Sequence, residues 1–91
     1  MSALDRIATG QATLSATRVQ VVAKRKDREG LMLTKHGSQD AYLGCSNVTT
    51  TNGSLFAGSC GTYLILPTTD EVYGVVSTGE LVISYLEIFS A

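Results

Sequence analysis

The sequence is poor in the residues on which catalytic, metal-binding and membrane-spanning proteins usually depend. Among 91 residues there is no tryptophan, one proline and one histidine, and charged residues make up 16%, well below the roughly 25% of an ordinary domain. No wholly aliphatic run exceeds three residues, Leu64 to Leu66 being one example, which is far short of a membrane span. Asp5 and Arg6 stand where a signal peptide would have its apolar segment. These features predict a soluble chain made in the cytoplasm.

The sequence contains few candidate catalytic residues. The single histidine, His36, lies in an expected turn with Ser38 and Asp40 nearby, and such side chains in a turn commonly bond to the local backbone. A nucleophile, its base and an orienting acid need positions on separate rigid elements. No glycine precedes a helix start, so no phosphate-binding loop is expected. We expect a non-enzymatic protein with no catalytic residue, metal ligand or cofactor, and with neither nucleic acid nor membrane as a partner.

The two cysteines, Cys45 and Cys60, lack the close C-x-x-C spacing of metal sites. Three states remain open for them. In the first, both are buried reduced thiols that act as small hydrophobic residues. In the second, they form an intrachain disulfide worth roughly 3 kcal/mol in the chain-entropy model. In the third, they form a bridge between subunits. In a reducing cytoplasm either bridge would form only after release.

The composition that is present is typical of β structure. About seven or eight short strands are separated by turn signals every eight to twelve residues, as in a sandwich or small barrel. Two hairpins are expected, one joining Leu31–Thr34 to Ala41–Gly44 and one joining Val72–Ser77 to Glu80–Phe89, and Asn52-Gly53 is a further turn signal. The sequence predicts a single all-β domain over residues 11–91, a compact β-sandwich or jelly-roll-like barrel, with a short N-terminal arm over residues 1–10.

Charge is distributed unevenly along the chain. All seven Lys and Arg residues lie within residues 1–35, and no charged residue occurs between Ala41 and Thr69. A basic cluster at residues 24–28 is interrupted by Asp27 and followed by Glu29. No stacking aromatics accompany it, so nucleic acid is not the expected partner. We expect this cluster to be a solvated turn or to contact an acidic protein surface. The candidate basic contact residues are Arg6, Lys24, Arg25, Lys26 and Arg28.

Uncharged β-prone sequence on an exposed sheet edge invites aggregation, so we expect these strands to be covered in an assembly. The last strand is apolar on both faces. Val82, Leu86 and Ile88 point to one side, and Leu81, Ile83, Tyr85 and Phe89 point to the other. A strand of this kind also indicates a second cover. The chain is therefore expected to form a homo-oligomer. The candidate subunit-interface residues are Tyr63, Leu81, Ile83, Tyr85 and Phe89.

A series of short motifs carries a family resemblance. REGLML (28–33), HGS (36–38), AYLG (41–44), VT (48–49) and NG (52–53) are followed by Gly58, LPTT (66–69), VYGV (72–75), STG (77–79) and YLE (85–87). In this order they resemble a type of small tailed-bacteriophage structural protein over about residues 18–88. Cys45 and Cys60 are not part of the pattern.

The resemblance implies a β-structured virion component, most simply a capsid decoration (cement) protein that stabilises the head lattice. Its implied partners are further copies of itself, plausibly a trimer at a threefold position, and the major capsid protein. A neck, tail or fibre-associated virion protein is the alternative within this class. A small glycan-binding β module is an alternative from another class, supported by hydroxyl-rich loops and weakened by the lack of tryptophan.

Overall fold

The computed structural model describes residues 7–89, and this part of the chain consists of eight strands joined by turns and loops. None of it is a helix long and apolar enough to cross a membrane. The predicted all-β fold class is confirmed. The strands are β1 (Ile7–Leu14), β2 (Val19–Val22), β3 (Arg28–Lys35), β4 (Ala41–Gly44), β5 (Ser54–Phe56), β6 (Tyr63–Leu66), β7 (Val72–Val75) and β8 (Leu81–Phe89).

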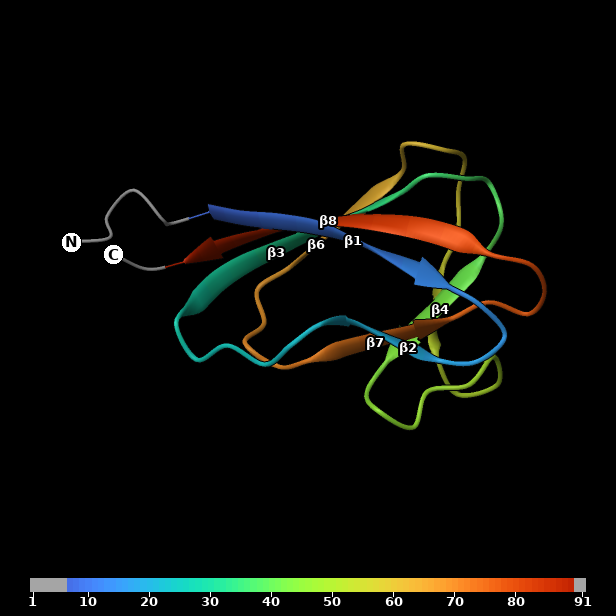
Figure 1. The fold of residues 1–91 in the computed structure, drawn as a ribbon, viewed down its shortest axis with the longest axis horizontal. Helices are drawn as coiled ribbons and strands as arrows, with labels where there is room; N and C mark the ends of the chain where they lie inside the picture. Colours follow the sequence, from blue (N-terminus) through green and yellow to red (C-terminus); the bar gives the residue numbers. More distant parts are fainter. Residues whose placement is uncertain (1–6, 90–91) are drawn as a thin grey trace.

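The strands form two four-stranded antiparallel sheets that pack as a sandwich (Figure 1). Sheet A has the order β1-β8-β3-β6, and sheet B has the order β2-β7-β4-β5. The first strand pairs with the last, the second with the seventh, the third with the sixth and the fourth with the fifth. This is how a long antiparallel hairpin pairs when it is rolled up, and it is the connectivity of a jelly roll.

Both expected hairpins are wrong. β7 lies in sheet B and β8 in sheet A, and β3 and β4 are likewise divided between the sheets. Their glycine-containing turns are corners at which the chain crosses the sandwich, because in a jelly roll most successive strands alternate between sheets. Within residues 7–89, β4 and β5 are the one pair of successive strands that hydrogen-bond to each other, and the loop between them contains Asn52-Gly53.

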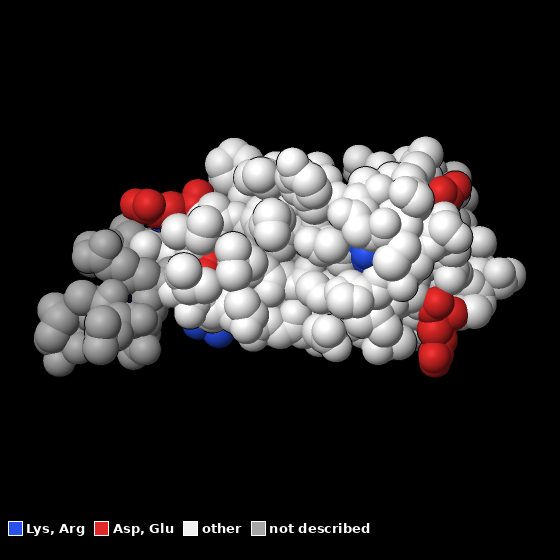
Figure 2. Space-filling view, turned by 90° about the horizontal axis from the view of Figure 1, so that it is seen from above, with Lys and Arg blue, Asp and Glu red and all other residues white. Residues whose placement is uncertain are grey.

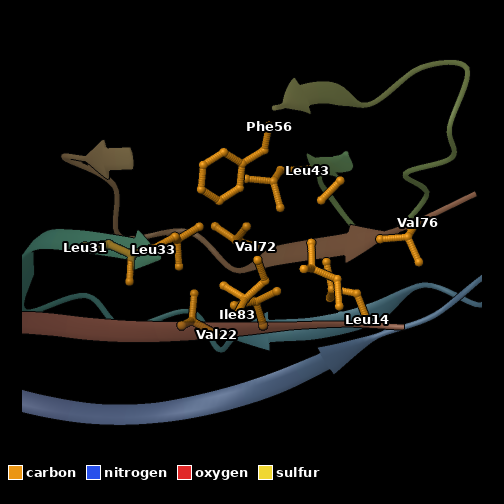
Figure 3. Packing of buried hydrophobic residues seen from close by; sticks show 12 residues of the cluster. Leu14, Val22, Leu31, Leu33, Leu43, Phe56, Val72, Val76 and Ile83 are labelled. Atoms are coloured by element: carbon orange, nitrogen blue, oxygen red, sulfur yellow. The ribbon is translucent and has the colours of Figure 1, made fainter. Parts of the chain in front are cut away.

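The core fills the space between the sheets. Alternate residues of β3 and β8 point inward, so that Leu31, Leu33 and Ile83 are at most 1% exposed. They meet side chains from sheet B, including Leu43, Phe56 and Val72, in one cluster (Figure 3).

Strand β1 begins at Ile7, so sheet A takes in residues 7–10, which the sequence assigned to the arm. The Tyr85 ring packs over Gly10, so this position in the strand has no room for a side chain. A Cβ atom at Gly10 would lie 2.5 Å from Cζ of Tyr85. The rest of the arm, including Arg6, lies outside the described residues.

Candidate assembly surface

The outward side of sheet A carries no charged side chain between its two ends. Residues directly opposite each other in an antiparallel ladder point to the same side of a sheet, so the register defines this side row by row. We call it the outer face. It comprises Ile7, Thr9, Gln11 and Thr13 of β1, Val82, Ser84, Leu86 and Ile88 of β8, Gly30, Met32 and Thr34 of β3, and Tyr63 and Ile65 of β6.

The apolar residues of the outer face gather toward one end. Ile7 lies opposite Ile88, and in the next row Met32 lies between Leu86 and Ile65. Ile7 is 61% exposed, Ile65 63% and Ile88 44%. Large contiguous apolar patches on a protein surface mark interaction sites. Figure 2, which views the sandwich from above sheet A in Figure 1, shows a largely white surface with acidic atoms toward both ends, basic atoms at the margin near one end and a small basic spot within the white area toward the other end.

The lateral edges of sheet A are also unprotected. Its edge strands are β1 and β6, and neither contains a charged residue. Soluble proteins usually place lysine, proline or another blocking device on such edges. Pro67 directly follows β6 and limits the length of that edge. The uncharged stretch between Ala41 and Thr69, for which the sequence predicted a cover, supplies only β6 to sheet A; its other strands, β4 and the edge strand β5, lie in sheet B.

One of the five predicted interface residues lies on the outer face. Tyr63 is 62% exposed there, whereas Leu81 and Ile83 belong to the core and are 3% and 0% exposed. Tyr85 is half-buried against the core, and Phe89 is half-buried on the inward parity of β8. Leu81 and Ile83 are wrong as interface residues because they fill the sandwich of their own chain. The outward residues of β8 are the other set, Val82, Ser84, Leu86 and Ile88.

Three of the predicted basic contact residues are exposed. Lys24, Arg25 and Lys26 lie on the connector between β2 and β3. The Arg25 guanidinium lies 3.9 Å from the Glu87 carboxylate and 5.5 Å from the centroid of the Phe89 ring. These contacts place the connector at the end of the sandwich where β8 ends.

Arg28 is wrong as a surface contact, because its side chain is fully buried. Its guanidinium donates a 2.6 Å hydrogen bond to the Glu87 carboxylate. It also donates to the backbone carbonyls of Thr68, Ala23 and Asp70. A buried charge is tolerated when it is paired and its remaining donors are satisfied, and here both conditions are met. Arg28 therefore ties β3, β8 and two connecting segments together.

A second buried cation, Lys35, was not singled out from the sequence. It is 1% exposed, and its ammonium donates a 2.9 Å hydrogen bond to the Gly58 carbonyl. The same nitrogen lies 5.6 Å from the centroid of the Phe56 ring, a cation–π distance. The signal was available, because Lys35 continues the inward alternation of Leu31 and Leu33.

Cys45 and Cys60 are both exposed free thiols, so of the three states left open the buried thiol is not the one observed. They are not joined as an intrachain disulfide. The ladder between β4 and β5 pairs Leu43 with Ser54 and Ala41 with Phe56. Cys45 follows β4 beyond one end of this ladder and Cys60 follows β5 beyond the other. A bridge between them would require the hairpin to rearrange.

His36 lies at the edge of the outer face, and its Nε2 is hydrogen-bonded to the Ser84 hydroxyl. The expected bond of this side chain to the local backbone is therefore replaced by a bond to a side chain of β8. Within residues 7–89 no carboxylate hydrogen-bonds to His36. A histidine beside a serine supplies two members of a nucleophilic site, and the third would be an acid that orients the ring.

The described residues line two cavities of interest. The larger, about 610 Å³, lies between the β1–β2 turn and the loop after β4, and is lined by Arg18, Tyr73, Val75 and several hydroxyl side chains. The smaller, about 300 Å³, lies near β5 and β6, and its lining consists of four leucines together with Gly44, Ser54, Thr68, Glu71 and Val72. No cluster of metal-ligating side chains occurs among the residues that the structure describes.

No protein-family model and no curated protein matches this sequence. Among solved structures, the chain is similar to an HTH_3 family transcriptional regulator from Vibrio cholerae, with a TM-score of 0.66 and 8% identity over 98% of this chain. The chain spans 47% of that protein's length. It is also similar to a Bacillus endospore appendage protein from a family of disulfide-linked pili, with a TM-score of 0.47, 14% identity, and coverage of 92% and 86% of the two chains. At 8% identity, the similarity to the regulator shows the fold alone.

Proposed function

We propose that this chain is a non-catalytic structural subunit of a bacteriophage virion, and that it decorates the capsid by docking the outer face of sheet A on the protein shell. The observation that carries the proposal is the outer face itself, a sheet surface without a charged side chain and with four large apolar residues 44–63% exposed, namely Ile7, Tyr63, Ile65 and Ile88. The motif order that resembles tailed-phage structural proteins supplies the kind of assembly.

The surroundings of the outer face support a protein partner. Protein interfaces combine an apolar, uncharged centre with a polar rim. At one end of this face lies the connector that carries Lys24, Arg25 and Lys26, all exposed. A fitting shell surface is apolar opposite the centre of the face and carries both signs of charge opposite the connector, because the exposed carboxylates of Asp27 and Glu29 accompany these cations. The resemblance implies a trimer at a threefold position, whereas docking of the outer face by itself sets no copy number.

The mechanism is mass action. A subunit that binds the assembled shell, and not its dissociated parts, stabilises the shell by its binding free energy. At a free concentration one hundred times Kd this amounts to about 2.7 kcal/mol per site. Because the sites repeat over the lattice, a modest affinity at each is enough to resist disassembly.

The test is co-sedimentation of the chain with undecorated capsids of the phage that encodes it. Ile65→Lys changes a residue of the outer face that is 63% exposed, and Leu55→Lys changes a residue of β5 in sheet B that is 58% exposed, so the two variants form a matched pair. Losing the burial of an isoleucine removes about 1.5–3 kcal/mol, which corresponds to about tenfold or more in affinity.

We expect Ile65→Lys to weaken shell binding by at least about tenfold and Leu55→Lys to bind as the wild type does. Equal binding by all three proteins would contradict the proposal, as would equal weakening by both variants. A change of Ile65→Lys from oligomer to monomer with unaltered shell binding would also contradict it, because the outer face would then cover another copy.

A second candidate function, glycan binding, is favoured by the larger cavity. Its lining combines Thr17, Thr49, Thr50 and Ser77 with Tyr73 and Arg18, groups that can bond to sugar hydroxyls and stack on a sugar ring. A glycan array tests it. Saturable binding that Tyr73→Ala abolishes would support this function, and an array without binding would exclude it.

A further inference from the structure

Strand β1 is a long, uninterrupted edge of sheet A. It spans eight residues, whereas the other strands that end a sheet, β2, β5 and β6, span four, three and four. Its pairing with β8 runs without a register shift from Ile7↔Ile88 to Leu14↔Leu81. It contains no charged residue and no proline. None of the usual protections of an edge, namely charge, proline or a bulge, is present in β1.

Among the described residues, no strand other than β8 pairs with β1. In an antiparallel ladder about half of a strand's N–H and C=O groups point away from its partner. Within residues 7–89, β1 has no backbone hydrogen bond outside its ladder with β8. Four of its side chains, those of Ile7, Thr9, Gln11 and Thr13, are exposed. The chemistry that matches such an edge is another extended strand.

We propose that β1 pairs antiparallel with β1 of a second copy of this chain, about a two-fold axis perpendicular to sheet A. The two sheets then form one eight-stranded sheet, and this inference rests on the proposed function because the two outer faces become one docking surface. In such an isologous contact the same edge serves both partners. Every outward cross-strand pair is neutral, so no like charges are brought together.

The opposite edge is a poor alternative partner for β1. β6 offers four residues against the eight of β1, and Pro67 follows directly. A β1-to-β6 contact would also be heterologous and would extend into rings or fibres. Pairing of β1 with itself matches length for length and closes after two copies.

The dimer is expected to be weak in solution and effective on a lattice. Stable protein–protein interfaces bury about 800 Å² on each partner, and one pair of edge strands supplies less than that. Once both outer faces dock on the same shell, however, the second contact becomes intramolecular, and avidity exceeds the affinity of either face.

Site-specific cross-linking tests the pairing. The exposed thiols are first removed with Cys45→Ser and Cys60→Ser, and single cysteines are then placed at Thr9, Gln11 or Thr13. Each protein is oxidised mildly, alone and in pairwise mixtures, after circular dichroism confirms the fold. Ile65→Cys on the opposite edge and Leu55→Cys on sheet B are the controls, because both positions are well exposed.

The antiparallel two-fold pairing predicts a rule. Residues that lie opposite each other have numbers with one constant sum, so that if Gln11 pairs with itself, Thr9 pairs with Thr13. Directly opposite positions have Cβ atoms about 4.5–5.5 Å apart, near disulfide distance, and we expect them to cross-link at least about tenfold faster than the controls. The products are dimers.

Cross-linking of all β1 positions at the control rate, fastest cross-linking at Ile65→Cys, or pairs that share no constant sum would each overturn the proposal. The outcome is separable from shell docking. If the β1 pairs obey the rule while Ile65→Lys binds shells normally, the docking proposal fails and edge pairing stands. If Ile65→Lys loses shell binding while no β1 pair cross-links, edge pairing alone fails.

Discussion

Removing Arg28 is expected to destabilise this protein more than any surface substitution. In Arg28→Met the Glu87 carboxylate, 3% exposed, loses the guanidinium 2.6 Å away and keeps Arg25 at 3.9 Å. The carbonyls of Thr68, Ala23 and Asp70 also lose a donor. Removing one partner of a buried pair costs about 3–5 kcal/mol. At about 4–8 °C per kcal/mol for a domain of this size, Tm falls by at least about 12 °C.

A matched control uses the same carboxylate. Arg25 also contacts Glu87, but its side chain is 51% exposed, so Arg25→Met should cost about 0–1 kcal/mol. The double variant Arg28→Met/Glu87→Leu removes both buried charges and should recover part of the loss. It does not recover all of it, because the carbonyls that bonded to Arg28 remain without a donor.

Urea denaturation followed by circular dichroism measures these differences. Because small single domains have a total stability of roughly 0.05–0.15 kcal/mol per residue, a loss of about 3–5 kcal/mol is a large part of the whole and easily resolved. A loss below about 1 kcal/mol for Arg28→Met, or one equal to that of Arg25→Met, would refute the assignment of Arg28 as a buried tie, since that is the size of an exposed pair.

Two further predictions concern the core and the thiols. Gly74→Ala should destabilise the fold by about 1–3 kcal/mol through overpacking, because the added Cβ would lie 2.8 Å from Cδ1 of Leu14 and 3.2 Å from Cδ2 of Leu43; unchanged urea denaturation would contradict this packing. Cys45 and Cys60 are exposed and free, so Ellman's reagent should titrate both in the reduced, folded protein. A thiol that reacts only after denaturation would show that it is buried.

The alternation of side chains along the strands predicted much of sheet A. The same alternation also indicates which charged residues of these strands are buried. The period of two that places Leu81, Ile83 and Tyr85 on one side of β8 puts Glu87 on that side as well, and Glu87 is buried. Lys35 follows from Leu31 and Leu33 in the same way. Arg28 does not, because a register shift between Arg28 and Gly30 reverses the alternation. Such a bulge depends on the neighbouring strand and leaves no clear mark in the local sequence.

The sequence indicated where the strands lie more clearly than which strands pair with each other. The turn at Thr78-Gly79 indicates a reversal of the chain, but the same glycine serves a tight hairpin or a corner between two sheets. Which one forms is decided by distant partners, here β1 and β3 for β8 and β2 and β4 for β7. This is also why the outward set of β8 was misassigned. Either set is apolar enough for the core, and the sheet opposite selects Leu81 and Ile83.

An image reconstruction of the decorated particle tests the central claim most directly. The account predicts that the outer face of sheet A lies against the shell, with Ile65 and Leu86 in the contact and Leu55 of sheet B facing solvent. A reconstruction in which sheet B contacts the shell and the outer face of sheet A is open to water would contradict the account.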